Sequence, residues 1–168
     1  MGERGETAVT EADLAHLRAS IAVAAAARAG GDHPFGAVLV TADGRVFDGG
    51  NRVNSDRDPT AHAETALVRV VSRELSQAEL AGSTMYASTE PCAMCAGAIV
   101  WSGIGRLVFG FSGHDLVELV AGLDGPSLDL PSRAVFAAAS GEVLVAGPLL
   151  ADEARVVHEG FWRAAAAD

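Results

Sequence analysis

Two helix starts carry the side chains that most constrain how this chain folds. Cys92 and Cys95 stand three residues apart after Pro91, at the start of a predicted helix, so both sulfurs face the same direction. His62 falls at the start of a second predicted helix, directly after a polar loop. The free N–H groups and the positive dipole end of a helix favour thiolates. We therefore expect a fold in which the two helix N-termini meet.

One imidazole and two thiolates make a set of three zinc ligands, and they leave a fourth position for water. An open position is typical of a catalytic zinc rather than a structural one. Glu64 lies two residues after His62, where a carboxylate can take a proton from that water and pass it to a substrate. Zinc lowers the pKa of such water towards about 7. The pattern predicts Glu64 as the catalytic residue and His62, Cys92 and Cys95 as the metal ligands.

Each feature has a plainer explanation when it is taken alone. His62 can be an ordinary helix-start histidine, the cysteine pair a redox dithiol, and Asn51 a turn residue. A structural zinc site needs a fourth protein ligand, and the chain has no third cysteine. The remaining candidates for that ligand are carboxylates and His16, His33, His114 and His158. A redox dithiol leaves His62 and Glu64 without a role, so the catalytic interpretation is favoured.

Strand and helix patterns alternate along the chain. Strands are predicted over 37–40, 45–50, 84–87, 106–111 and 142–145, and helices over 61–75, 92–101 and from about Leu150. The first helix starts at Thr10, capped with Asp13, and ends at Gly30-Gly31. Loops are expected at 51–59, 88–91 and 122–131. The order predicts an α/β layered fold. The length of 168 residues fits a flexible segment over 1–9 and a single domain over 10–168.

The charge balance restricts the class of partner. The chain has 12 Lys and Arg against 22 Asp and Glu, a formal net charge of −10, which argues against binding tRNA or DNA. Its 2 cysteines are too few for a disulfide framework. The apolar run at 21–27 is too short to span a membrane. We expect a cytoplasmic protein that acts on a small substrate, without a nucleic-acid or membrane partner.

The two motifs belong to longer stretches, DPTAHAE at 58–64 and EPCAMCAGAI at 90–99. These resemble the signature of the cytidine/deoxycytidylate deaminase superfamily, zinc-dependent enzymes that deaminate nucleobases. Residues 34–38 and Asn51 match the segments that precede the signature, and the resemblance covers about 10–111. It implies a three-layer α/β/α fold with a five-stranded mixed sheet. It also implies one catalytic Zn²⁺ per chain, hydrolytic release of ammonia from an amidine-like ring carbon, and a homodimer.

Within this superfamily, the chain is most similar to the guanine deaminase branch and its free-base neighbours. Phe35 and Trp101 are typical of that branch, and their flat faces would stack on a planar heterocycle. Ordinary core packing explains both aromatic residues equally well. In relatives, the asparagine equivalent to Asn51 hydrogen-bonds the substrate ring. Ala61, directly before His62, is taken as a further substrate contact.

The C-terminal part departs from the guanine deaminase pattern. Asp124 fits the first residue of an Asp-Asp pair in that branch, but Gly125 replaces the second, and Asp115 is an alternative. Residues 158–162, with Phe161 and Trp162, resemble an aromatic segment that covers the substrate. Guanine-like and cytosine-, isocytosine- or triazine-like bases are therefore all candidate substrates. The alternatives are a nucleoside deaminase, a tRNA-editing adenosine deaminase and a non-enzymatic structural zinc domain.

Overall fold

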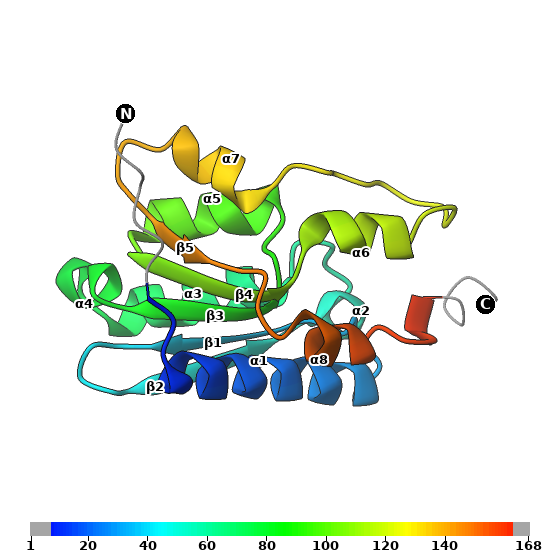
Figure 1. The fold of residues 1–168 in the computed structure, drawn as a ribbon, viewed down its shortest axis with the longest axis horizontal. Coiled ribbons are helices and arrows are strands. Elements are labelled where there is room, and N and C mark those ends of the chain that lie inside the picture. The colour runs from blue at the N-terminus through cyan, green and yellow to red at the C-terminus, as the bar shows by residue number, and fades with distance from the viewer. Residues whose placement is uncertain (1–7, 163–168) are drawn as a thin grey trace.

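A computed structural model describes residues 8–162, which form one mixed sheet with helices on both faces (Figure 1). The strand order is β2-β1-β3-β4-β5. Strand β1 pairs with β2 and with β3 in antiparallel fashion, whereas the β3–β4 and β4–β5 pairs are parallel. The strands are β1 Gly36–Val40, β2 Val46–Gly50, β3 Thr84–Thr89, β4 Arg106–Phe111 and β5 Leu144–Ala146. The predicted five-stranded mixed sheet is confirmed.

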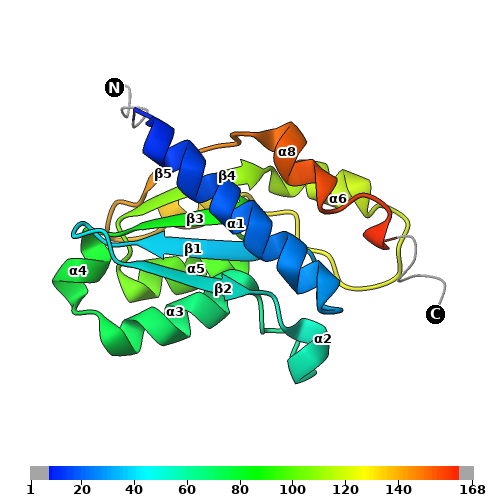
Figure 2. The same cartoon turned by 90° about the horizontal axis from the view of Figure 1, so that it is seen from below.

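Helices α1 (Glu11–Ala29) and α8 (Ala151–Val156) lie on one face of the sheet, where α1 crosses the strands (Figure 2). The predicted cap is present, because Thr10 and Asp13 form a reciprocal capping box and Gly30 ends the helix. Buried side chains fill this layer: Leu17, Val38, Tyr86, Val108 and Ala146. Leu17 comes from α1, and the other four come from strand positions that face this helix, as the period of two of a strand requires.

Helices α3 (Ala63–Glu74), α5 (Ala93–Ser102) and α7 (Ser132–Ala137) lie on the other side of the sheet. The remaining alternate strand positions point into this larger core, where Leu39, Met85 and Phe109 pack with residues of these helices. Helix α3 packs on β1, β2 and α5, and α7 packs on α5. The three-layer α/β/α architecture is therefore also confirmed. The layer built by α3 and α5 places their N-termini side by side.

Short helices are the main difference from the sequence prediction. Helix α2 lies inside the loop expected at 51–59, and α4, α6 and α7 lie in segments without a predicted helix. Their bounds are α2 Val53–Asp56, α4 Gln77–Ala81, α6 Gly113–Leu119 and α7 Ser132–Ala137. Segments of two turns or fewer show too little periodicity to be recognised. Strand β3 continues to Thr89, into the expected loop, and β5 lies slightly later than 142–145.

The close packing of α1 on β1 depends on Gly36. A Cβ atom at this position would lie 2.4 Å from the Ala24 nitrogen and 2.4 Å from the Ser20 oxygen. Only glycine allows the backbones of α1 and β1 to approach so closely. This contact positions the segment before β1, which carries His33 and Phe35.

The sequence also predicted a flexible N-terminal segment and no membrane-spanning segment. Most of the flexible segment predicted over 1–9 lies outside the described residues, which begin at position 8. Among residues 8–162, no helix combines the length and apolar character that crossing a bilayer requires.

Candidate active site

The two predicted helix starts meet in the structure. His62 is the N-cap residue of α3, and Cys92 is the N-cap residue of α5. Neither side chain hydrogen-bonds to its own helix as a cap, so both are directed to other partners. Cys95 lies in the first turn of α5 and is buried. Packing of α3 against α5 brings one nitrogen and two sulfur ligands together at the positive ends of two helices.

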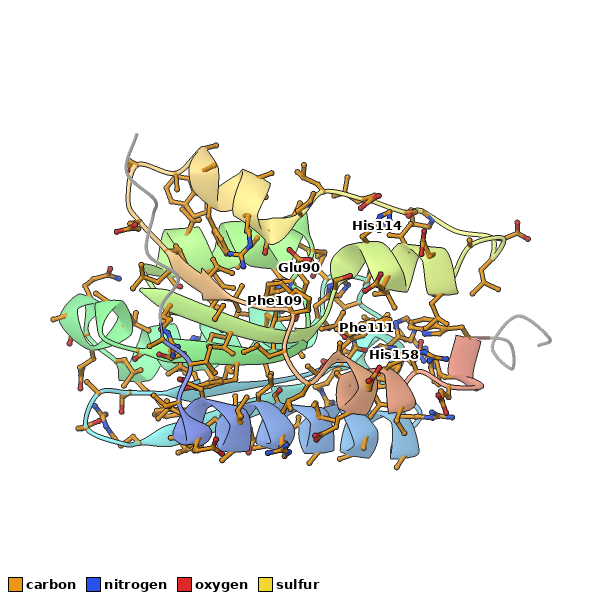
Figure 3. The ribbon with its side chains drawn as sticks, viewed as in Figure 1. Glu90, Phe109, Phe111, His114 and His158 are labelled. Atoms are coloured by element: carbon orange, nitrogen blue, oxygen red, sulfur yellow. The ribbon has the colours of Figure 1, made fainter. Side chains whose placement is uncertain are left out.

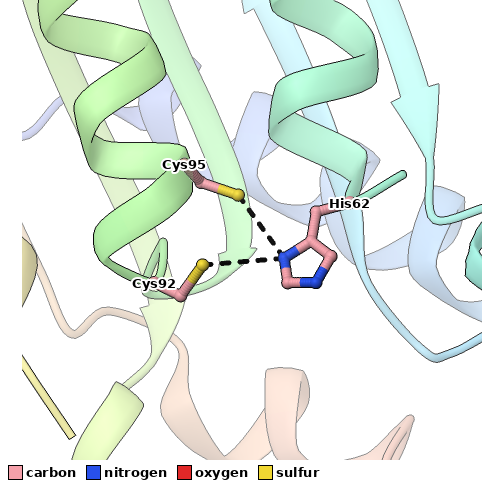
Figure 4. Close-up of side chains that lie close together, drawn as sticks. All are labelled: His62, Cys92 and Cys95. Carbon is pink, nitrogen blue, oxygen red and sulfur yellow. Dashed lines mark hydrogen bonds between the residues drawn. The ribbon is translucent and has the colours of Figure 1, made fainter. Parts of the chain in front are cut away.

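The three side chains converge on one point (Figure 4). Nδ1 of His62 lies 3.6 Å from Sγ of Cys92 and 3.5 Å from Sγ of Cys95. A tetrahedral zinc with usual bond lengths of about 2.3 Å to sulfur and about 2.0 Å to nitrogen separates such atoms by about 3.5 Å. The donor and acceptor in each of these two contacts depend on the tautomer of His62. A shared metal ion accounts for both distances, and the donor set fits zinc.

A fourth protein ligand is absent from the described residues. His62, Cys92 and Cys95 form the only group of three or more His, Cys, Asp or Glu ligand atoms within 4.8 Å of one another in that part of the chain. His16 packs on Tyr86, and the side chain of His114 is 66% exposed on α6. The arrangement matches a catalytic zinc site, in which one position stays free, better than a structural site.

The cysteine pair is prepared for metal binding. The hydrogen bond from the Cys95 thiol lowers the pKa of Cys92 to about 4, against the effect of burial, and His62 adds to this lowering. Cys92 is therefore a thiolate at neutral pH, the form that binds metals. The same hydrogen bond, together with burial, raises the pKa of Cys95. Metal binding must therefore release the Cys95 proton.

Glu64 lies in the first turn of α3, next to this group. Its side chain is buried, with 5% of the residue exposed, and it contacts the thiol of Cys95. Burial raises the pKa of Glu64, because the ionised carboxylate loses its water shell. A carboxyl group with a raised pKa can both accept and return a proton near neutral pH. The structure thus places the predicted catalytic residue beside the predicted ligands.

Asn51 is buried and held in one orientation. Its Oδ1 atom accepts hydrogen bonds from the backbone N–H groups of His33, at 3.3 Å, and Val53, at 3.0 Å. Because both partners are donors, the amide oxygen must face them and Nδ2 must point the other way. Nδ2 is buried without a hydrogen-bond partner among the described residues. An unpaired buried donor is costly unless a ligand accepts from it.

Aromatic side chains from both ends of the chain gather near Asn51. His33, Phe35, His158, Phe161 and Trp162 form what we call the aromatic wall. The ring of His33 lies 5.4 Å from that of Trp162, and the ring of Phe35 lies 5.3 Å from that of His158. The pKa of His33 is lowered by burial and then by the charge of His62. His33 is therefore the member of the wall that lies within electrostatic range of His62.

Ala61 is the remaining predicted contact at this site, and it is buried with 3% exposed. Its N–H group donates to the Asp58 carbonyl, and its own carbonyl accepts from the Arg52 N–H. These bonds fix the backbone directly before His62. The structure shows a backbone role for Ala61.

Three predicted substrate contacts lie elsewhere. Trp101 is 90% exposed at the far end of α5, about 13 Å along the helix from Cys92. Asp115 lies on α6, on the wall of a surface depression of about 450 Å³ between α6 and α8. Asp124 is exposed in the loop that follows α6. The length of α5 places Trp101 away from Cys92 of its own chain, which does not favour a contact with the same substrate. Asp115 and Asp124 are exposed, and a substrate contact at these two positions stays a prediction.

From the sequence, His33 and His158 were expected only as candidate fourth ligands of a structural zinc, with His158 also at the start of the aromatic segment 158–162, and Glu90 had no expected site role. Histidine at 158 is spaced four residues before Trp162, a helical spacing that signals a side-chain contact. His33 precedes Pro34-Phe35 but matches no motif. His33 contacts Trp162 and His158 contacts Thr89, and both contacts join segments that are distant in the sequence. A single sequence motif does not reveal such contacts.

Glu90 anchors the loop before the cysteines (Figure 3). Its Oε2 atom accepts from the Gly113 N–H at 3.1 Å, and its Oε1 atom accepts from the N–H of Ser132 at 2.9 Å and from the Ser132 hydroxyl at 2.7 Å. The carboxylate therefore ties the starts of α6 and α7 to the loop that leads into Cys92. These bonds make Glu90 a supporting residue rather than a metal ligand.

Comparisons with known proteins agree with this geometry. Residues 10–111 match the family model described as the cytidine and deoxycytidylate deaminase zinc-binding region. The chain is 45% identical over 158 residues to the probable cytosine deaminase of Schizosaccharomyces pombe, covering 93% of this chain and 96% of that protein. It is 43% identical over 107 residues to the tRNA-specific adenosine deaminase of Haemophilus influenzae, covering 62% of this chain and 61% of that protein.

A solved structure shares the fold. The crystal structure of an NE0047 mutant in complex with 8-azaguanine matches with a TM-score of 0.74 and 26% identity, covering 90% of this chain and 86% of that one. The ligand in that structure is a nucleobase analogue.

Proposed function

Because this chain belongs to the cytidine and deoxycytidylate deaminase zinc-binding family, we propose that it hydrolyses a free base of the cytosine type and releases ammonia. Deamination of a nucleobase is the function that the site supports best. The observation that carries it is the buried carboxyl group of Glu64 beside the convergent His62, Cys92 and Cys95. The similarity to a cytosine deaminase over nearly the whole of both chains favours a pyrimidine base.

His62, Cys92 and Cys95 would hold one zinc ion per chain, which supplies a Lewis acid that activates water near neutral pH. Glu64 takes one proton from the attacking water and delivers it to the ring nitrogen, and it then carries the second proton, from the new hydroxyl group on the ring carbon, to the departing amino group. The carbon–oxygen bond forms first, and the carbon–nitrogen bond to the amino group then breaks as the ring carbonyl forms, so water and base become a carbonyl product and ammonia. Metal analysis of the purified protein checks the stoichiometry.

Asn51 supports recognition of a base with a ring carbonyl. Its unpaired Nδ2 donor requires an acceptor, and the ring carbonyl oxygen of a base such as cytosine provides one. The aromatic wall supplies flat apolar faces for the ring, with Phe35 and Trp162 5.9 Å apart between centroids. These contacts suit a small planar heterocycle.

A tRNA substrate is less well supported, although a tRNA deaminase matches part of the chain. Basic side chains must be available to bind phosphates. Of the described arginines, several are already engaged: Arg18, Arg45, Arg52, Arg106 and Arg155 form ion pairs, and Arg28 and Arg133 donate to carbonyl groups. The net charge of −10 adds further repulsion.

The zinc-loaded protein is tested on cytosine, isocytosine, guanine, adenine, ammeline, cytidine and an anticodon stem-loop, with ammonia release as the measurement. We expect the fastest turnover with cytosine. Glu64→Gln should keep its zinc and lose at least about 100-fold in kcat. Glu74→Gln, an exposed change on the same helix, is the matched control. Absence of ammonia from every free base would overturn the proposal, and preference for the stem-loop would support the tRNA alternative.

We also propose that the protein is a homodimer in the cytoplasm. The sequence of α5, AMCAGAIVWS, contains no charged residue, although α5 lies in an outer layer. Met94 and Trp101 on this helix are exposed, and apolar faces of this kind mark interfaces. The two free cysteines fit a reducing compartment. Sedimentation of the wild type and of Trp101→Glu tests the dimer, and a monomeric wild type would contradict it.

A further inference from the structure

His158 is a buried histidine that the deamination steps above do not use. It lies in the turn after α8, near Phe111 (Figure 3), and is only 1% exposed. Its ring lies 5.3 Å from that of Phe35 and 5.7 Å from that of Phe111. Its ring lies 6.1 Å from the ring of Trp162, with an interplanar angle of 13°. A purely apolar residue would pack here as well, so the imidazole needs a separate explanation.

The hydrogen bonds of His158 determine its tautomer. Nε1 of Trp162 lies 3.4 Å from Nδ1 of His158, and an indole N–H can only donate. Nδ1 therefore accepts, and a neutral imidazole then carries its proton on Nε2. Nε2 lies 3.1 Å from the Thr89 hydroxyl and donates to it. Burial lowers the pKa of His158 to about 4, with a contribution from the charge of Arg28, which keeps the ring neutral.

These two bonds connect the C-terminal segment to the centre of the sheet. Thr89 is the last residue of β3, three residues before Cys92, and it is 1% exposed. Trp162 belongs to the aromatic wall and contacts both His33 and Phe35. An imidazole accepts from the indole and donates to the hydroxyl in one plane, which phenylalanine and leucine cannot do.

A second anchor holds the same segment but does not orient the indole. Nη1 of Arg28, at the end of α1, donates to the Val157 carbonyl at 2.7 Å, and its guanidinium lies 5.8 Å from the Phe161 ring. Arg28 thus fixes the path of the backbone. The orientation of the Trp162 ring depends on its N–H bond and on ring packing.

We propose that His158 is a positioning residue that fixes Trp162 as one side of the base-binding site. It acts through Trp162 and does not touch the reacting atoms. The inference deepens the proposed function, on which its kinetic part rests. Its consequence is that His158 governs substrate affinity more than the chemical step.

Two variants separate the hydrogen bonds from the packing. His158→Phe keeps a buried ring but removes both bonds, whereas His158→Gln keeps one donor and one acceptor. Both are made with Trp101→Phe, so that Trp162 is the only one of the 2 tryptophans that remains. The matched control is His16→Phe, which replaces a histidine of α1 that packs 5.2 Å from the Tyr86 ring and is not part of the aromatic wall.

For His158→Phe we expect greater quenching of Trp162 fluorescence by acrylamide and a rise of about tenfold in the KM for cytosine. The kcat value and the zinc content should stay close to those of the parent. His158→Gln should bring both the quenching of Trp162 and the KM most of the way back to the values of the parent. Thr89→Val should show part of the increase in each. His16→Phe should match the parent in both measurements.

Unchanged quenching of Trp162 in His158→Phe would overturn the proposal. The proposal would also be overturned if His158→Phe and His158→Gln lost zinc and kcat to the same extent, because such losses would indicate a general structural role for His158. A parent that does not deaminate cytosine refutes the proposed substrate instead. The quenching measurement needs no turnover, so it still decides the role of His158 in that case.

Discussion

Nδ1 of His62 lies 3.5 Å from Sγ of Cys95, although the two residues are 33 positions apart in the chain. Packing of α3 against α5 makes this contact, and the same packing buries Glu64 beside it. The metal ligands therefore join two helices that share one core. Binding of a metal and stability of the fold must depend on each other.

Removal of the metal should lower stability as well as activity. At free zinc about 100-fold above its dissociation constant, binding stabilises the native state by about 2.7 kcal/mol. We expect a chelator to lower the free energy of unfolding by about this amount, measured by urea denaturation, and zinc to restore it. Glu64→Gln should show the same change because it keeps all three ligands. If the purified protein contains zinc but its urea midpoint is the same with and without the chelator, the assigned metal ligands are wrong.

Asn51→Asp should separate substrate recognition from loop structure. The aspartate keeps an oxygen that accepts from His33 and Val53, but it replaces the Nδ2 donor with a second acceptor. We expect kcat/KM for cytosine to fall at least about 100-fold, with a melting temperature near that of the wild type. The readouts are steady-state kinetics and thermal unfolding. Kinetics close to wild type would show that Nδ2 does not bind the substrate.

Asp13 should make stability depend on pH. Burial alone would raise the pKa of Asp13, but hydrogen bonds from Arg106, the Thr10 backbone and Tyr86 outweigh it and lower the pKa. Because the pKa of Asp13 is lower in the folded protein, its stabilising effect is complete at pH values above the unfolded pKa of about 4. This stabilisation is lost progressively as the pH falls below that value. Asp13→Asn should cost about 3 kcal/mol at pH 7, because it leaves Arg106 without its partner.

The check is urea denaturation between about pH 7 and pH 3, where the difference between wild type and Asp13→Asn should shrink as the pH falls. Glu153→Gln removes the exposed ion pair with Arg18 and should have a much smaller effect. A difference that stays constant with pH would mean that the charge of Asp13 is unimportant.

Glu90→Ala should loosen the segment between β4 and β5. The change leaves the Gly113 and Ser132 donors without their acceptor, and we expect a loss of about 3 kcal/mol. Ser132→Ala removes only the hydroxyl bond and should cost about 1 kcal/mol. Hydrogen exchange over 112–132 measures the loosening of the segment, and urea denaturation measures the loss in the free energy of unfolding. Equal protection of this segment in Glu90→Ala and wild type would refute the role of Glu90.

Local sequence was sufficient for the elements with a clear period or a specific terminus. The Thr10–Asp13 cap, the Gly30 stop, the hairpin and the helix starts at His62 and Cys92 all depend on neighbours within a few residues. Helices α6 and α7 were missed, because they are short and depend on contacts such as the Glu90 bonds.

The aromatic residues also show the difference between what local sequence predicts and what the tertiary structure decides. Trp101 and Trp162 were both expected at the substrate site, but Trp101 is 90% exposed, whereas Trp162 packs against His33 and Phe35. Residue type predicts that a large ring contacts something apolar, but not which surface it reaches. His158, a member of the aromatic wall, forms a hydrogen bond with Thr89, 69 positions away.

By itself, the sequence determined which side chains can bind a metal and move a proton, because ligand type and helix-start spacing are local chemical properties. Only the tertiary structure decided which rings and donors surround that centre. Those contacts join strand ends, α1 and the C-terminal turn, and they form only when the whole sheet has buried its two faces.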